Sequence, residues 1–127
     1  MSAIASRSGR TAVAGGLLAA LVLVASGAAA HTFVTRTEPR SGATVADPPS
    51  AVRIWFDGPV EPVFIDIRVE DGANRRVDRG GGRLSATDST LVETGLTPLA
   101  PGRYRVYWSV IARDGHRREG TFSFLLK

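Results

Sequence analysis

Two histidines and one aspartate are the residues of this sequence whose types and spacing could bind a metal ion. The chain has 127 residues and two histidines, His31 and His116, and Asp114 stands two positions before His116. A carboxylate and an imidazole at this spacing, in a polar turn between two apolar runs, can bind one centre. The function then depends on whether His31 joins them.

His31 follows a stretch that is typical of a secretory signal peptide. Residues 1–30 have two arginines near their start, Arg7 and Arg10. An apolar run follows at 16–25, and the stretch ends in the small residues Ala28-Ala29-Ala30. The apolar run is shorter than a membrane span of about 18–20 residues and is diluted by glycine and alanine, which disfavours a retained anchor. We therefore predict a signal peptide at 1–30 and an exported domain at 31–127, in the periplasm or at the cell exterior and envelope.

Cleavage after Ala30 would make His31 the first residue, with a free α-amine. The amine nitrogen and the ring Nδ1 of such a histidine can close a chelate ring on one metal ion. With Asp114 and His116, the donors are three nitrogens and one carboxylate oxygen, a set that favours Cu(II) over Ni(II) and Zn(II). Binding must displace protons from the amine and the imidazoles, so the affinity should fall as the pH drops.

Sulfur ligands are absent from the predicted exported domain. The sequence has no cysteine, and its single methionine is Met1. The domain therefore has no disulfide, although an exported protein could form one. We expect a Cu(II) site and no Cu(I) site.

Two other readings of these residues remain. An isolated Asp-x-His turn is usually a solvated, capped turn, so a metal-free, immunoglobulin-like interaction module is one alternative. The other is an enzyme, because an amine, two imidazoles and copper also resemble the site of copper-dependent polysaccharide monooxygenases. The 97 residues left after cleavage give little room for a substrate surface, and Asp114 on the metal would quench redox cycling. We therefore predict no enzyme and no catalytic residue.

The charge pattern excludes a nucleic-acid partner. The formal net charge is +4, and two of the basic residues belong to the predicted signal peptide, which leaves +2. Basic and acidic residues alternate along the rest of the chain, as on a solvated surface.

The apolar pattern after residue 31 predicts an all-β fold of about seven strands, separated by turn residues at intervals typical of a sandwich. Alternation of apolar and polar residues places the strands at 32–37, 52–56, 63–70, 75–78, 89–94, 103–112 and 121–126, with a further fragment near 84–86. The residues expected to face the core include Trp55, Tyr104, Val106, Trp108, Val110, Phe122, Phe124 and Leu126.

The domain resembles the CopC family of exported copper-binding and copper-resistance proteins over its whole length. The most specific feature is Asp114-x-His116, with Trp108 six residues earlier and Gly120 four residues later. Further matching residues are His31, Thr37-Glu38-Pro39, Gly42, Phe56, Pro98-Leu99, Gly102, Tyr104, Val106 and Phe124.

The resemblance implies a Greek-key β-sandwich or barrel, of cupredoxin or immunoglobulin-like type, that binds one Cu(II) ion. It implies that His31, Asp114 and His116 are the ligands, and it makes a CopD-like membrane copper transporter the expected partner of a monomeric carrier. Two departures stand out. The methionine-rich loop of some members is missing, and Gly58 occupies a position where some members have glutamate, which leaves open whether Asp57 or Glu61 adds a ligand.

Overall fold

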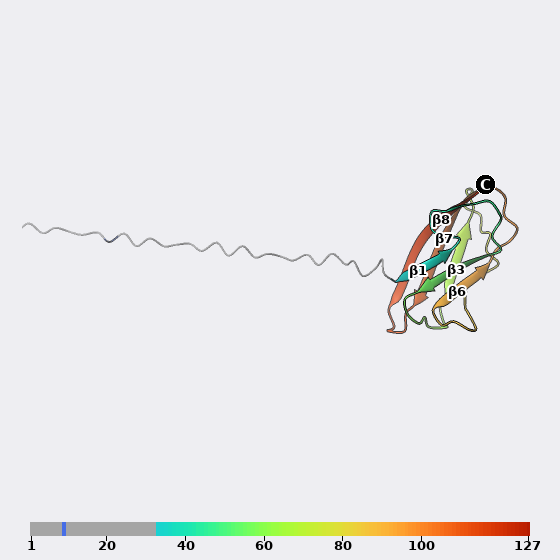
Figure 1. The fold of residues 1–127 in the computed structure, drawn as a ribbon. Helices are drawn as coiled ribbons and strands as arrows, with labels where there is room; N and C mark the ends of the chain where they lie inside the picture. The colour runs from blue at the N-terminus through green and yellow to red at the C-terminus, as the bar shows by residue number, and fades with distance from the viewer. Residues whose placement is uncertain (1–8, 10–32) are drawn as a thin grey trace, which may run out of the picture.

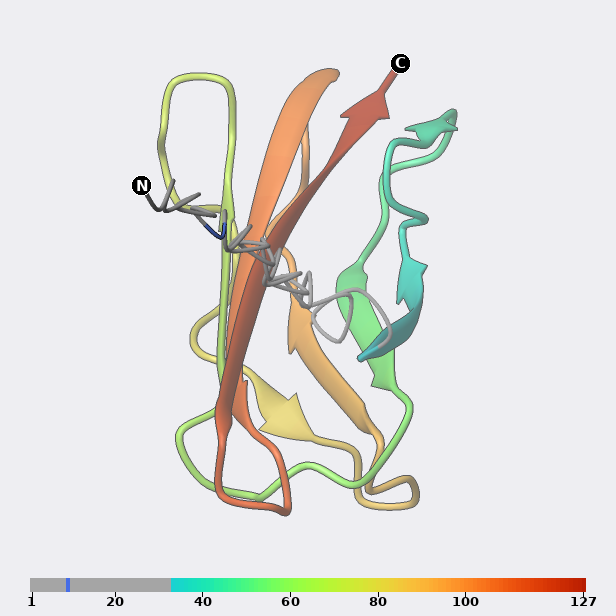
Figure 2. The same cartoon turned by 90° about the vertical axis from the view of Figure 1, so that its left-hand side faces the viewer.

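The computed structural model describes residue 9 and residues 33–127. The rest of the predicted signal peptide, and His31 after it, lie outside the described residues. Within the described ranges every regular element is a strand, and no helix there is long and apolar enough to cross a membrane. Eight strands form two four-stranded sheets that lie face to face, which confirms the predicted all-β sandwich (Figures 1 and 2).

The two sheets are built from strands that are distant in sequence. The first sheet has the order β1 (Val34–Glu38), β3 (Ala51–Phe56), β6 (Leu91–Gly95) and β5 (Arg83–Leu84). The second has the order β2 (Thr44–Val45), β8 (Arg117–Leu126), β7 (Gly102–Ile111) and β4 (Asp66–Glu70). Among the strand pairs of residues 33–127, only the short β2–β8 pair is parallel. The chain therefore crosses repeatedly between the sheets, as the predicted Greek-key sandwich requires.

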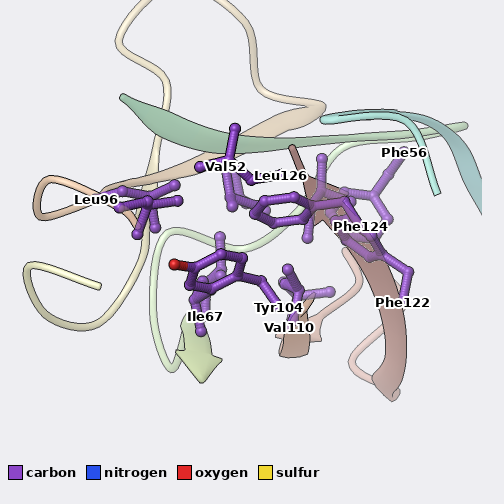
Figure 3. Packing of buried hydrophobic residues seen from close by; sticks show 14 of the residues in the cluster. Val52, Phe56, Ile67, Leu96, Tyr104, Val110, Phe122, Phe124 and Leu126 are labelled. Atoms are coloured by element: carbon purple, nitrogen blue, oxygen red, sulfur yellow. The ribbon is translucent and has the colours of Figure 1, made fainter. Parts of the chain in front are cut away.

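The core lies between the sheets and is made of alternate residues of the long strands. Burying each large apolar side chain contributes about 1.5–3 kcal/mol to folding. The predicted inward face of the last strand is confirmed, because Phe122, Phe124 and Leu126 are all buried (Figure 3). The other core residues include Val52, Ile54, Phe56, Ile67, Val69, Val92, Tyr104, Val106 and Val110.

The two tryptophans differ in their environment. Trp108 is half-buried and packs against the core, close to the prediction. The prediction that Trp55 belongs to the core is wrong. Its neighbours Ile54 and Phe56 are buried, so the two-residue period of the strand turns Trp55 to the outer face, where the Arg36 guanidinium stacks 4.4 Å from its ring centroid.

Several predicted strand boundaries are also wrong. The strand predicted at 63–70 begins only at Asp66, because Phe64 has a φ of 55° and its side chain is 83% exposed. The strand predicted at 75–78 is reduced to isolated bridges, and β2 was not predicted at all. The last strand begins at Arg117 rather than at residue 121, because pairing with β7 extends through its charged residues.

Candidate metal site

The turn between β7 and β8 positions the Asp-x-His pair. The backbone N–H of Ala112 donates to the carbonyl of His116 at 2.9 Å, and the N–H of Gly115 donates to the carbonyl of Ala112 at 2.8 Å. Gly115 has a φ of 85°, a left-handed conformation that residues with a Cβ rarely adopt. The ten-residue pairing of β7 with β8 holds the turn at one end of the sandwich.

Asp114 and His116 converge within this turn. Asp114 Oδ1 accepts a hydrogen bond from the His116 backbone N–H at 2.9 Å, and Asp114 Oδ2 lies 3.2 Å from Nδ1 of the imidazole. The hydrogen bond from this N–H, followed by the His116 side chain, lowers the pKa of Asp114. Both side chains are exposed, at 54% for Asp114 and 73% for His116, so an ionised carboxylate and an imidazole stand together in solvent.

Arg118 links this pair to the described start of the domain. Arg118 Nη2 is 3.7 Å from Asp114 Oδ2, and the guanidinium carbon of Arg118 is 5.5 Å from the ring centroid of Phe33. The sequence interpretation missed both Phe33 and Arg118. The only available signal was that each stands two residues after a predicted ligand.

The loop between β3 and β4 is the third segment at this end. The Asp57 N–H donates to the Phe33 carbonyl at 2.9 Å, and the Glu61 N–H donates to the Ile111 carbonyl at 2.8 Å. The loop and the β7–β8 turn lie at the same end of the sandwich (Figure 2). The structure therefore ties the backbone of Glu61, which is half-buried, to the end of β7, and the backbone of Asp57, which is exposed, to Phe33.

A row of aromatic rings supports the same end from inside. The Phe33 and Phe56 ring centroids are 4.9 Å apart, and Phe56 meets Trp108 edge-on at 5.3 Å. The Trp108 indole covers Gly120, where an added Cβ would lie 2.6 Å from the ring atom Cζ2. The indole of Trp108 therefore occupies the space that a side chain at position 120 would need.

The described residues supply only part of a metal site. Across residues 33–127, no three His, Cys, Asp or Glu side chains are grouped closely enough to hold a metal ion. Of the predicted ligands, Asp114 and His116 are brought together. The third, His31, lies outside the described residues.

A family model described as the CopC domain matches residues 34–127. The chain belongs to the CopC family. This CopC protein is 30% identical to CopC from Methylosinus trichosporium OB3b, whose crystal structure matches with a TM-score of 0.70 over 76% of this chain and 94% of that chain. PcoC of Escherichia coli, described as a methionine-rich copper resistance protein, shares the fold with a TM-score of 0.65 at 22% identity, over 77% of this chain and all of PcoC.

Curated relatives agree with this assignment. The copper transport protein CutJ of Bacillus subtilis (strain 168) is 28% identical over 109 residues, which make up 85% of this chain and 20% of CutJ. Protein YobA of Escherichia coli (strain K12) is 29% identical over 102 residues, 77% of this chain and 80% of YobA.

Family membership decides between the alternatives that the sequence left open. As a CopC protein, the chain is a copper-binding protein of the copper-resistance type. It is not an enzyme, which sets aside the monooxygenase alternative, and copper binding sets aside the metal-free interaction module.

Proposed function

We propose that this CopC protein is an exported, monomeric carrier that holds one Cu(II) ion through His31, Asp114 and His116. In this role it buffers copper outside the cytoplasm or delivers it to a CopD-like membrane transporter. The proposed domain begins at His31, after removal of the signal peptide at 1–30.

The observation that carries the proposal is the exposed Asp114–His116 pair, which Arg118 links to Phe33. The carboxylate oxygen and the ring nitrogen, 3.2 Å apart, are close enough to face one ion. Only Thr32 separates His31 from Phe33, and two residues of chain span at most about 7 Å. This short connection is why we propose that the amine and imidazole of His31 join Asp114 and His116.

The donor set fits Cu(II). The nitrogen donors are the α-amine and the imidazoles of His31 and His116, and the oxygen donor is Asp114. No sulfur ligand accompanies them, because the chain has no cysteine and its only methionine is Met1. Nitrogen-rich, sulfur-free sites select Cu(II) rather than Cu(I).

The test uses purified protein that begins at His31. We expect His116→Ala, Asp114→Ala and one extra glycine before His31 each to weaken Cu(II) binding by at least 100-fold in chelator competition. The same glycine added after Lys127 is the matched control and should leave binding unchanged. The EPR spectrum of the unmodified protein should report three nitrogen ligands.

Unchanged affinity in the chain extended before His31 would contradict the role of the amine. Unchanged affinity in both turn variants would contradict the site as a whole. Sequencing of the exported protein from its N-terminus tests the cleavage site, and a sequence that begins elsewhere than His31 would overturn it.

A further inference from the structure

We propose that Arg118 is a positioning residue for the copper site. Its guanidinium joins the start of the domain to the β7–β8 turn, and so holds the two sources of ligands in place before the metal binds. The inference rests on the proposed ligand set, because it explains how His31 is kept beside Asp114 and His116.

The contacts of Arg118 reach both segments. On one side its Nη2 lies 3.7 Å from Asp114 Oδ2, the same oxygen that lies 3.2 Å from the imidazole of His116. On the other side its guanidinium carbon lies 5.5 Å from the Phe33 ring centroid, within the range of a cation–π interaction. One side chain therefore touches a predicted ligand and a residue two positions after another.

These contacts connect two segments that are far apart in the sequence and belong to different sheets. Phe33 precedes β1 in the first sheet, whereas Arg118 belongs to β8 in the second sheet. The ring of Phe33 is in turn fixed against Phe56 at 4.9 Å. Arg118 thus bridges the two sheets, from Phe33 to Asp114 of the β7–β8 turn.

Removing Arg118 would change the Cu(II) affinity in opposite directions, depending on whether Arg118 acts through its charge or through its contacts. A cation near the metal repels Cu(II), so a purely electrostatic Arg118 would lower the affinity, and its removal would raise it. A positioning residue limits the conformational freedom that binding must remove, so its removal lowers the affinity. The contact with Phe33 matters only if Arg118 is a positioning residue, and we assign the positioning role to it.

The neighbouring arginine provides a matched control. Arg117 carries the same charge one position earlier, but its Nε donates to Ser109 Oγ at 2.9 Å and lies 3.7 Å from Glu119 Oε2. Neither contact involves Asp114 or Phe33. Arg117→Gln therefore removes a positive charge next to the turn without breaking the proposed connection.

The experiment measures Cu(II) affinity and EPR spectra for protein that begins at His31. We expect Arg118→Gln and Phe33→Leu each to weaken binding about tenfold, which corresponds to about 1.4 kcal/mol. The double variant should be little weaker than either single variant, because both remove one connection. Arg118→Lys should restore most of the affinity, and Arg117→Gln should behave as the unmodified protein.

The EPR spectrum distinguishes positioning from a general loss of stability. In Arg118→Gln we expect a mixture of Cu(II) species at saturating copper, because the ligands are no longer held in one arrangement. Tighter binding by Arg118→Gln, or no effect of Phe33→Leu, would overturn the positioning role. Those results leave the proposed ligands intact, whereas full affinity in Asp114→Ala and His116→Ala would overturn the proposed function and this inference together.

Discussion

The imidazole Nδ1 of His116 lies 3.2 Å from Oδ2 of Asp114, across a single glycine with left-handed backbone angles. The proximity of the two side chains is a property of the turn, because the His116 backbone N–H also donates to the other oxygen of the same carboxylate. Local hydrogen bonds therefore hold the Asp114 carboxylate and the His116 backbone in one arrangement within the turn.

The conformation of Gly115 should matter for both stability and copper binding. Its φ of 85° disfavours a Cβ, although no atom would obstruct one within 4 Å. We expect Gly115→Ala to cost about 1 kcal/mol of unfolding free energy and to weaken Cu(II) binding a few-fold. Gly115→Asn is the control, since asparagine tolerates this conformation. Urea unfolding measures the first effect, and an alanine variant more stable than the asparagine variant would contradict the explanation.

Gly120 should tolerate no side chain beneath Trp108. An alanine Cβ would lie 2.6 Å from Cζ2 of the indole, which must then move from its edge-on contact with Phe56. We expect Gly120→Ala to lower the unfolding free energy by about 1–3 kcal/mol, with a shift in tryptophan fluorescence. Gly58→Ala is the matched control, because nothing lies within 4 Å of its added Cβ. Equal stability of the two variants would show that Trp108 moves freely.

Asp78 should stabilise the segment that precedes β5. Its side chain is only 1% exposed, it pairs with Arg76 at 2.8 Å, and its Oδ1 accepts the Val69 N–H at 2.8 Å. Losing the charge in Asp78→Asn should cost about 2–3 kcal/mol in urea unfolding, because hydrogen bonds to a charged group are strong. The exposed Asp66→Asn should cost little, and similar losses in the two variants would contradict a special role for Asp78.

Acid should remove the stability that the ionised Asp78 side chain contributes. Burial acts to raise the pKa of Asp78, but the hydrogen bonds from Arg76 and from the Val69 N–H outweigh it and hold the pKa below the ordinary value. A lowered pKa contributes stability above the ordinary value of 3.8, and that stability is lost as the pH falls through the folded-state pKa. Unfolding free energies measured between about pH 5 and pH 2 should therefore fall more steeply in the unmodified protein than in Asp78→Asn.

The pH dependence of copper binding should come from nitrogen ligands alone. The pKa of Asp114 is lowered, so this carboxylate stays ionised throughout the range in which an amine and imidazoles lose their protons. We expect Cu(II) affinity to fall steadily from about pH 8 to about pH 5. Asp114→Asn should bind more weakly with the same pH slope in chelator competition, and a flatter slope would show that Asp114 itself exchanges a proton in this range.

The alternation of apolar and polar residues along the sequence was enough to predict most of the strands. Alternation identified the inward faces that carry Tyr104, Val106, Phe122 and Phe124, because side chains along a strand alternate between two faces. It failed at Trp55, where hydrophobicity suggested a core position and the pleat of the strand puts the side chain on the outer face. It failed again at Phe64, a left-handed residue at a position without glycine, so that the strand begins only at Asp66.

The sequence by itself determined the chemistry of this protein: a sulfur-free set of donors, the Asp-x-His turn, and the alternating strands of a sandwich. Only the tertiary structure decided that Arg118 of β8 contacts Phe33, and that the loop at 57–61 hydrogen-bonds both to Phe33 and to the β7–β8 turn. The reason is physical. A turn and a strand face are set by neighbouring residues, whereas contacts between two sheets depend on strand order and register, which form only when distant segments pair.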